Sequence, residues 1–308
     1  MSIKEGIVNE LYAPSRKRFP TRPVVVKGFH ELLQADLLDM SFYKKHNKNY
    51  RYILVVIDIF SKYLYTEILK SKKAKEVVEA FAKILKRVKA IPKHIHTDEG
   101  GEFYNRLMTQ LLKKYDINHF STHSNLKAQI VERVNRTLRG LITKAFHTKS
   151  SFQWIKFLPE IVKKYNNTTH STIKMKPSQV KKSDEAKLLT TVFKFEPFDP
   201  SRNTLKVGDF VRISKYRNIF DKPSALMNFS PELFTIEKIQ NTNPRTYLVK
   251  DLNGNTIKGA FYKYELKKTK YPDTYLVEKI MKKRGDKALV KWLGFKTPSL
   301  IPIKDILS

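Results

Sequence analysis

The sequence contains no cysteine among its 308 residues. Disulfide bonds, cysteine nucleophiles, iron–sulfur clusters and thiolate zinc sites are therefore excluded. No apolar run approaches the roughly 20 residues that a membrane-spanning helix needs. The first ten residues, MSIKEGIVNE, contain no apolar signal-peptide core. These absences lead us to expect a soluble intracellular protein without a membrane partner.

Acidic residues are scarce, since 29 Asp and Glu stand against 60 Lys and Arg, for a formal net charge of +31. The positive excess is spread along the whole chain and forms no separate tail. A protein this basic repels itself unless a polyanion accompanies it. Nucleic acid, bound through its phosphates, is the obvious polyanion. A ribosomal-type protein is an alternative, and so is a genome with lysine-rich codon use, although the latter does not explain the scarcity of acids.

The apolar pattern divides the chain into an arm and an α/β domain. Residues 1–29 are expected to form an extended basic arm, because Pro20 and Pro23 discourage helix. Residues 30–192 are expected to form a mixed α/β layer fold with one central sheet and flanking helices. The expected strands are 31–40, 50–60, 62–69, 91–96 and 117–120, and the expected helices are 77–88, 103–115, 129–146, 151–166 and 177–190.

The C-terminal third is expected to be all β. A proline-containing stretch at 193–204 predicts a linker. The regular spacing of short strands over 205–268, with the hairpin signal Asn253-Gly254, predicts a small β-barrel. Residues 269–308 predict a third unit, which is too small for a large core of its own.

Three acidic residues stand where strands end or a helix begins. Asp36 lies in a strand, Asp98 follows a short strand, and Glu132 lies in the first turns of the long helix. Such side chains can converge on one point, and a few oxygen ligands are what Mg²⁺ prefers. Asp39 is expected to point to the opposite face from Asp36, since side chains alternate along a strand.

The long helix also carries polar residues on the side of Glu132. Asn135, Arg136 and Arg139 follow Glu132 at i+3, i+4 and i+7, and Lys127 precedes the helix. A carboxylate followed by cations suits a metal beside a DNA backbone, so we predict these four residues as DNA contacts. An ordinary solvated helix face with Glu–Arg pairs explains the same spacing.

Five ordered motifs carry a family resemblance: QADLLDM, LVVIDIFSKY, HTDEGGEFYN, KAQIVERVNRTLRG and YNNTTHSTIKMKPSQV. Together they resemble the catalytic core of retroviral-like DDE integrases. ELFTIEKI, TYLVKDLNG and IKGAFYKYEL resemble the barrel region of integrases of Maverick/Polinton transposons. The resemblance implies an RNase H-like core with a mixed five-stranded sheet, followed by an SH3-like DNA-binding barrel.

The resemblance also implies an activity, which is 3′-end processing and strand transfer of element or viral DNA into target DNA. It implies two Mg²⁺ or Mn²⁺ ions per active site, with Asp36 shared between both ions and Asp98 and Glu132 each holding one. Two departures stand out. Leu33 replaces a tryptophan that is frequent before this motif, and the family's N-terminal zinc domain is impossible without cysteine.

The last unit, TYLVEKIMKKRGDKALVKWLGF, resembles a chromodomain. Tyr275, Trp292 and Phe295 match its three aromatic-cage positions, and such a cage holds methylated ammonium by cation–π attraction. The tryptophan usual near 299–302 is missing. The alternative is that these aromatic side chains form the small unit's core.

The implied partners are double-stranded DNA (element ends and target), further copies of the chain and histone tails, in the host nucleus or a viral particle. A domesticated, catalytically inactive DNA- and chromatin-binding protein is the alternative. An RNase H-type nuclease is a third hypothesis, but it requires a fourth carboxylate. Glu99 and Glu102 are taken as bystanders, Asp58 as a turn residue, and a metal site at His94 and His96 as improbable.

Overall fold

The computed structural model describes residues 2–16, 19–22, 24–88, 90–121, 129–194, 205–215, 227–295 and 297–306, without the side chain of Gln129. The chain divides into two compact units. The core unit comprises the described residues between 24 and 194. The composite unit comprises the described residues between 2 and 22 together with the described residues from 205 onward. Within the described part of the chain, no helix combines the length and apolarity that a bilayer crossing requires.

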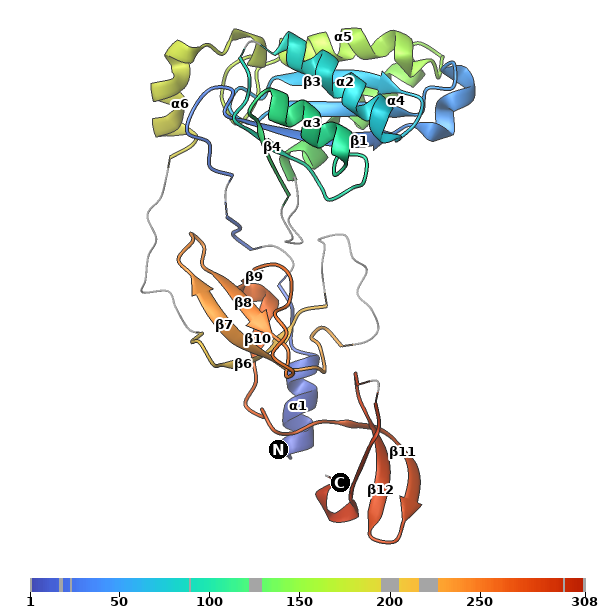
Figure 1. The fold of residues 1–308 in the computed structure, drawn as a ribbon, viewed down its shortest axis with the longest axis vertical. Helices are drawn as coiled ribbons and strands as arrows, with labels where there is room; N and C mark the ends of the chain where they lie inside the picture. Colours follow the sequence, from blue (N-terminus) through green and yellow to red (C-terminus); the bar gives the residue numbers. More distant parts are fainter. Residues whose placement is uncertain are drawn as a thin grey trace. The chain divides into compact units, whose positions relative to one another are not determined.

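The core unit is built on a mixed five-stranded sheet in the order β3-β2-β1-β4-β5 (Figure 1). Three antiparallel strands are followed by two parallel ones, so the sheet is mixed and five-stranded, as the resemblance implied. The strands are β1 (Leu32–Asp39), β2 (Tyr52–Asp58), β3 (Leu64–Leu69), β4 (His94–His96) and β5 (Asn118–Phe120).

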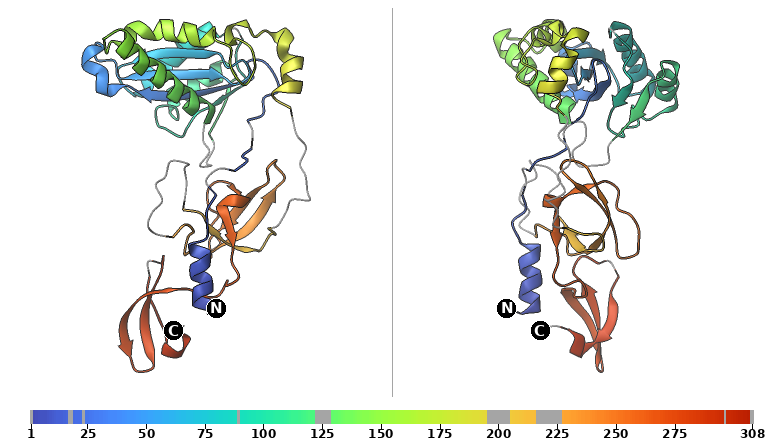
Figure 2. Two further views of the ribbon diagram at one scale, coloured as in Figure 1. Left: turned by 180° about the vertical axis from the view of Figure 1, so that it is seen from behind. Right: turned by 90° about the vertical axis from the view of Figure 1, so that its left-hand side faces the viewer.

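Helices cover both faces of this sheet (Figure 2). The helices are α2 (Ala74–Arg87), α3 (Arg106–Lys114), α4 (Gln129–Thr148), α5 (Trp154–Asn166) and α6 (Glu185–Thr191). Alternate residues of β1 point to opposite faces: Leu33 and Ala35 pack toward α2 and α3, whereas Leu32 and Leu38 pack toward α4 and α5. Asp36 has the parity of Leu38 and therefore faces α4.

The composite unit contains two antiparallel sheets. The first has the order β10-β6-β7-β8-β9, with β6 (Phe210–Ile213), β7 (Phe234–Gln240), β8 (Thr246–Lys250), β9 (Phe261–Tyr262) and β10 (Leu266–Lys268). Gly254 has a φ of +87° in the predicted turn after β8, where a side chain would be strained. The predicted linker lies almost wholly outside the described residues, which resume at 205.

The last sheet consists of β11 (Val277–Arg284), β12 (Lys287–Trp292) and β13 (Ser299–Pro302). The predicted turn at Gly285 is present, with a φ of +60°. The sequence led us to expect two strands and a short terminal helix here, whereas the structure adds strand β13 and has only one 3₁₀ turn after it, over Ile303–Asp305. Ala288 and Val290 are fully buried, and they are the only hydrophobic residues described in these three strands that reach this burial. The core of this part is therefore as small as its length led us to expect.

The predicted extended arm is wrong for its first part, since Ile3–Leu11 form helix α1. Ser2 and Glu5 make a capping box at its start, so two otherwise unpaired backbone N–H groups are satisfied. Ile7 and Leu11, four residues apart on one helix face, are each only 1% exposed. The proline signals that suggested an extended chain belong to residues beyond the helix.

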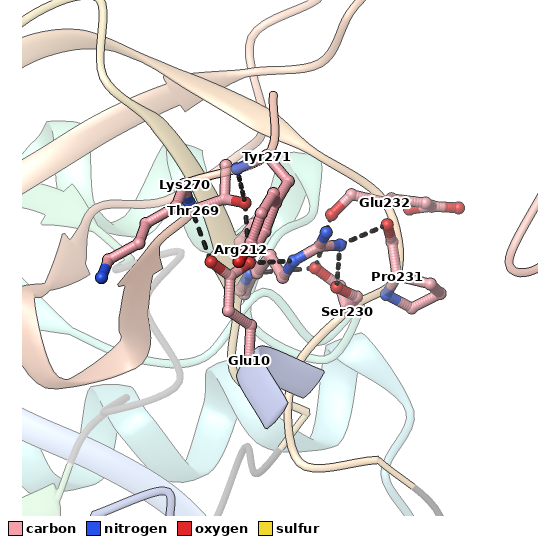
Figure 3. A network of polar contacts seen from close by, with 9 residues as sticks. Glu10, Arg212, Ser230, Pro231, Glu232, Thr269, Lys270 and Tyr271 are labelled. Atoms are coloured by element: carbon pink, nitrogen blue, oxygen red, sulfur yellow. Dashed lines mark hydrogen bonds and ion pairs between the residues drawn. The ribbon is translucent and has the colours of Figure 1, made fainter. Parts of the chain in front are cut away.

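Hydrogen bonds and an ion pair of Glu10 connect α1 to the first sheet of the composite unit (Figure 3). Its carboxylate accepts hydrogen bonds from Arg212 Nε at 3.3 Å, Thr269 Oγ1 at 2.7 Å and the Lys270 backbone N–H at 2.8 Å. Arg212, at 1% exposure, also donates from Nη1 to the carbonyl oxygens of Ser230 and Pro231. The buried cation thus has several acceptors, as a buried charge requires.

Candidate functional site

Asp36 lies on β1, on the face that α4 covers. Its Oδ1 accepts a hydrogen bond from the backbone N–H of Leu37 at 2.8 Å, and its Oδ2 accepts one from Asn135 Nδ2 at 2.7 Å. Each carboxylate oxygen offers two lone pairs. Asp36 is therefore held in position and still has acceptor capacity on both oxygens.

The register between β1 and β4 aligns Asp98 with Asp36 along the two strands. The parallel pairing of β1 and β4 sets Gln34 opposite His96, and the two aspartates each follow two residues later. The backbone N–H of Gly100 donates to Asp98 Oδ1 at 3.2 Å. Neighbouring parallel strands run in the same direction, so residues at equal distance beyond a paired position lie toward the same edge of the sheet.

Gln34 brings the start of α4 to the same edge, and sequence reasoning missed its role. This fully buried side chain accepts a hydrogen bond from the Val131 backbone N–H at 3.1 Å through Oε1. Its Nε2 lies 3.1 Å from Nδ1 of His96 on β4. One amide thus joins β1, β4 and the first turn of α4, where Glu132 is the next residue. A glutamine inside an otherwise apolar strand was the available signal.

The charges of Asp98 and Glu132 act on Asp36. The pKa of Asp36 is raised to about 6, mainly by burial and further by the charges of Asp98 and Glu132, against the lowering effects of the Leu37 hydrogen bond and of Lys72. Like charges nearby disfavour the ionised form of a carboxyl group. Asp98 and Glu132 thus lie within electrostatic reach of Asp36.

Whether these residues suit a metal follows from their chemistry. The set offers only carboxylate oxygens, which are the ligands that Mg²⁺ and Mn²⁺ prefer. Among the residues that the structure describes, no three acidic or histidine side chains are gathered tightly enough to hold an ion as they stand. The oxygen donors of these three side chains thus suit a hard divalent cation in chemical type. Binding such an ion would require the three carboxylates to move closer together.

The predicted DNA contacts divide into different environments. Asn135 is 9% exposed and its amide is engaged with Asp36, so it is placed to position that carboxylate and does not face solvent. Arg136 and Arg139 are exposed on α4, and Arg139 Nη2 donates to the Asp39 carbonyl at 3.3 Å. Lys127 lies outside the described residues.

Two other aspartates take the structural positions expected of them. Asp39 is exposed, and although partial burial opposes it, hydrogen bonds from Ser41 lower its pKa. Asp58 is fully buried and accepts from the Phe60 backbone N–H and from Ser61 Oγ, with His30 Nδ1 at 3.0 Å. Neither belongs to the carboxylate group around Asp36.

His96 is also not arranged as a metal ligand. Burial, and to a smaller extent the neighbouring His119, lower its pKa. The ring stacks on Phe120 at 4.9 Å between centroids. Its Nδ1 lies 3.1 Å from Nε2 of Gln34. This contact accounts for a buried histidine at this position without a metal.

Gly100 leaves room for the acidic side chains around it. A Cβ on Gly100 would lie 2.6 Å from Glu102 Oε2 and 3.1 Å from Asp98 Oδ1, whereas one on Gly101 would meet nothing within 4 Å. Glu102, which was taken as a bystander, therefore lies beside Asp98. The sequence clue was only its spacing of four residues.

We expect Gly100→Ala to lower any activity that depends on Asp98 by about tenfold, because small displacements of a reacting group are costly. Glu102 can swing away, but Asp98 must shift by a few tenths of an ångström. Gly101→Ala is the matched control and should behave as wild type. Steady-state rates of the two variants measure the difference, and equal rates would contradict the crowding at Gly100.

The three aromatic residues that were predicted to form a cage lie close to one another in the last unit. The ring centroids of Tyr275 and Trp292 are 6.2 Å apart, and those of Tyr275 and Phe295 are 5.4 Å apart with planes at 88°. Trp292 Nε1 donates to Ser299 Oγ on β13 at 2.6 Å. These rings stand at steep angles to one another, and this geometry is compatible with either a cage or a small core.

Comparison with known proteins finds relatives of the core unit. Residues 29–124 match the family model described as the integrase core domain. A transposon-derived protein of Caenorhabditis elegans is 38% identical over 183 residues, which cover 59% of this chain and 62% of that protein. The Gag-Pol polyprotein of Walleye dermal sarcoma virus is 29% identical over 168 residues, covering 51% of this chain and 9% of the polyprotein.

A solved structure extends the likeness in fold. A chain of the simian T-cell lymphotropic virus intasome, determined in complex with the PP2A regulatory subunit B56 gamma, superposes with a TM-score of 0.60. The match has 16% sequence identity and covers 85% of this chain and 86% of that one. This chain therefore contains a retroviral-type integrase core domain with the RNase H-like fold, and it has transposon-derived and retroviral Pol relatives. It spans less than two thirds of the length of those relatives.

Proposed function

We propose that this protein is a DNA integrase, a metal-dependent polynucleotidyl transferase that processes the 3′ ends of an element's DNA and joins them to target DNA. The observation that carries the proposal is the Gln34 junction, which ties β1, β4 and the start of α4 together beside Asp36, Asp98 and Glu132. Burial and the charges of Asp98 and Glu132 raise the pKa of Asp36, and carboxylates perturbed in this way are frequent at sites with a functional use. Binding a divalent cation is the simplest such use.

Each residue has a stated role in this proposal. Asp36, Asp98 and Glu132 would hold two Mg²⁺ or Mn²⁺ ions, with Asp36 shared between them. When bound, the ions supply activation of the attacking oxygen and stabilisation of the leaving oxygen. Asn135 and Gln34 are positioning residues, because they act on the carboxylate and on the helix that carries Glu132. Arg136 and Arg139 would contact DNA phosphates from the exposed face of α4.

The proposed partners follow from the chemistry. Concerted joining of two DNA ends requires at least two active sites, so we propose that the chain acts as a homo-oligomer on double-stranded DNA. The motifs in the first sheet of the composite unit favour an element of the Maverick/Polinton type, acting in the nucleus or from a viral particle. An SH3-like, DNA-binding role for that sheet belongs to the same proposal.

A strand-transfer assay tests the function. Labelled duplex oligonucleotides, generic and with candidate terminal repeats, are incubated with the full chain in Mn²⁺ or Mg²⁺. We expect joined products that disappear with EDTA and with Glu132→Gln. DNA binding that persists without any products, across the terminal repeats tested, would favour the alternative of a domesticated, inactive DNA- and chromatin-binding protein.

A second candidate function concerns the aromatic group of the last unit. We propose that Tyr275, Trp292 and Phe295 bind a methylated lysine of a histone tail, because three rings at steep angles present π faces to a cation. Tyr275→Ala should weaken binding of a trimethyl-lysine peptide about tenfold, and Tyr275→Phe should keep it. Trp292 fluorescence measures the affinity. No binding by wild type, or equal binding of the unmethylated peptide, would assign the rings to the core.

A further inference from the structure

Lys62 is a buried cation in the turn between β2 and β3. The residue is 5% exposed, and its side chain forms no hydrogen bond or ion pair with any residue that the structure describes. Its Nζ lies 5.4 Å from the centroid of the Phe193 ring. Burial lowers its pKa to about 8, although Asp58 opposes this shift, and Arg133 adds to it. A buried ammonium without an acceptor lowers the stability of the fold.

The backbone of Lys62 adds a second cost. Its φ is +60°, in the left-handed region that glycine and asparagine adopt more readily than lysine. Its N–H donates to the carbonyl oxygen of Asp58 at 2.8 Å, which closes the turn. The Asp58 carboxylate is occupied elsewhere, since it accepts from the Phe60 N–H and from Ser61 Oγ. The turn therefore holds a lysine in a strained backbone conformation, and its ammonium has no described acceptor.

Asn166 fixes the end of α5 beside this turn. Its buried amide accepts from the Leu64 N–H at 2.8 Å and donates to the Leu64 carbonyl at 2.9 Å. His170 follows four residues later, and its Nδ1 accepts from the Thr172 N–H at 3.1 Å. A ring nitrogen that accepts a hydrogen bond carries no proton, so the proton of His170 is on Nε2. Nε2 is therefore a donor, and no described residue accepts from it.

Lys62, Arg133 and His170 form one basic cluster. The pKa of His170 is lowered by burial and further by the charges of Lys62 and Arg133. Arg133 also acts on Lys62, so each of the three lies within electrostatic reach of the other two. Arg133 is exposed on α4, its side chain pairs with no described residue, and His170 is half-buried. These two side chains thus form the solvent side of the cluster.

We propose that this basic cluster binds one phosphate dianion, either the free ion or a phosphate monoester. Its donors are an ammonium, a guanidinium and an imidazole N–H, and charged donors form the strongest hydrogen bonds to an oxyanion. A phosphate monoester carries about −1.5 to −2 charges at pH 7 and has three acceptor oxygens, which match two cations and three donors. A carboxylate matches less well, because it has one charge and two oxygens. The inference goes beyond the proposed function and does not depend on it.

Thermal unfolding of the full chain in EDTA, without DNA, tests this inference independently of strand transfer. All proteins carry Trp292→Phe, so that fluorescence follows the buried Trp154 of the core unit. Inorganic phosphate is compared with sodium chloride of the same ionic strength. The test variant is Lys62→Met, which removes the ammonium and keeps an apolar side chain. The matched control is Lys86→Met, at an exposed lysine of α2, on the opposite side of the sheet from α4.

Without phosphate, Lys62→Met should melt about 2 °C or more above its parent, because an apolar group then replaces an unpaired buried charge. For a Kd of about 1 mM, about 50 mM phosphate should raise the melting temperature of the parent and of Lys86→Met by about 5 °C more than that of Lys62→Met. The general salt effect of phosphate acts on every variant and cancels in this difference. Arg133→Gln, an exposed change, should melt like the parent without phosphate and lose at least about half of the gain.

Equal phosphate gains in the parent and in Lys62→Met would overturn the inference. A Lys62→Met protein that melts below its parent without phosphate would also overturn it, because the ammonium would then serve to pair with Asp58. An equal gain with acetate or with dimethyl phosphate, a singly charged diester, would overturn the assignment to a dianion. A larger gain with adenosine monophosphate than with inorganic phosphate would identify a monoester as the ligand, and the reverse order would identify the free ion.

Discussion

Asp36→Asn is expected to reduce strand transfer by at least about 10³-fold, the loss typical of removing one group that stabilises transition-state charge. The substitution keeps the size of the side chain and removes its charge, so the proposed shared ligand is lost. Asp39→Asn is the matched control, three residues further along the same chain. We expect it to retain wild-type activity, because Asp39 is exposed and bonded to Ser41.

Asp36→Asn should not lower the thermal stability of the metal-free protein. The buried Oδ1 of Asn135 has no hydrogen-bond partner among the described atoms, and its Nδ2 donates to Asp36. Rotation of the Asn135 amide would offer Oδ1 to the new side-chain amide at position 36. Removing one charge also relieves repulsion with Asp98 and Glu132. Thermal unfolding of the metal-free variant should therefore begin no earlier than that of wild type.

Two results would contradict this account of Asp36. An active Asp36→Asn protein would remove Asp36 from the proposed site. A variant that is inactive and also unfolded at lower temperature would reduce Asp36 to a structural residue. Activity that is lost equally in Asp39→Asn would show that charge along β1, rather than this carboxylate, is required.

Glu10→Ala is expected to destabilise the composite unit by about 3–5 kcal/mol, the cost of leaving a buried charge without its partner. Arg212, a residue that is only 1% exposed, would lose its only carboxylate among the described residues, and Thr269 and Lys270 would lose an acceptor (Figure 3). Hydrogen exchange of the amides in β6 and β10 measures this change without interference from the core unit.

The double variant Glu10→Ala/Arg212→Met provides the control. It replaces the ion pair by apolar groups, which is often nearly neutral for stability, so much of the lost protection should return. A cost below about 1 kcal/mol for Glu10→Ala alone would mean that α1 does not pack on the sheet in solution. A double variant as unstable as the single one would assign the effect to Thr269 and Lys270 instead.

Local sequence signals predicted most of the core unit. Tyr52–Asp58 is a run of β-branched and apolar residues, and in α2 the residues Val77, Phe81, Ile84 and Leu85 form one apolar stripe, so each segment allows only one regular structure. Strand parity likewise separated Asp36 from Asp39. These predictions succeeded because neighbouring residues along the chain decide them.

The misses share a different cause. The hydrogen bond of Asn135 to Asp36 was not foreseen, because its position on the helix was known but the residue opposite it was not. Helix α1 was missed because its buried face is completed by Arg212, about 200 residues later. Gln34 drew no prediction, since its two partners come from β4 and α4. The partner of a polar side chain is not encoded in its own segment.

By itself, the sequence determined the excess of basic charge, the absence of cysteine chemistry, the α/β order of the core and the identity of three acids at element ends. These follow from composition and from periodicities of two or 3.6 residues. Only the tertiary structure decided that Asn135 supports Asp36, that Glu102 lies beside Asp98, and that Glu10 of α1 pairs with Arg212 of β6. The reason is physical: burial and electrostatic fields depend on distance in space, and packing sets that distance.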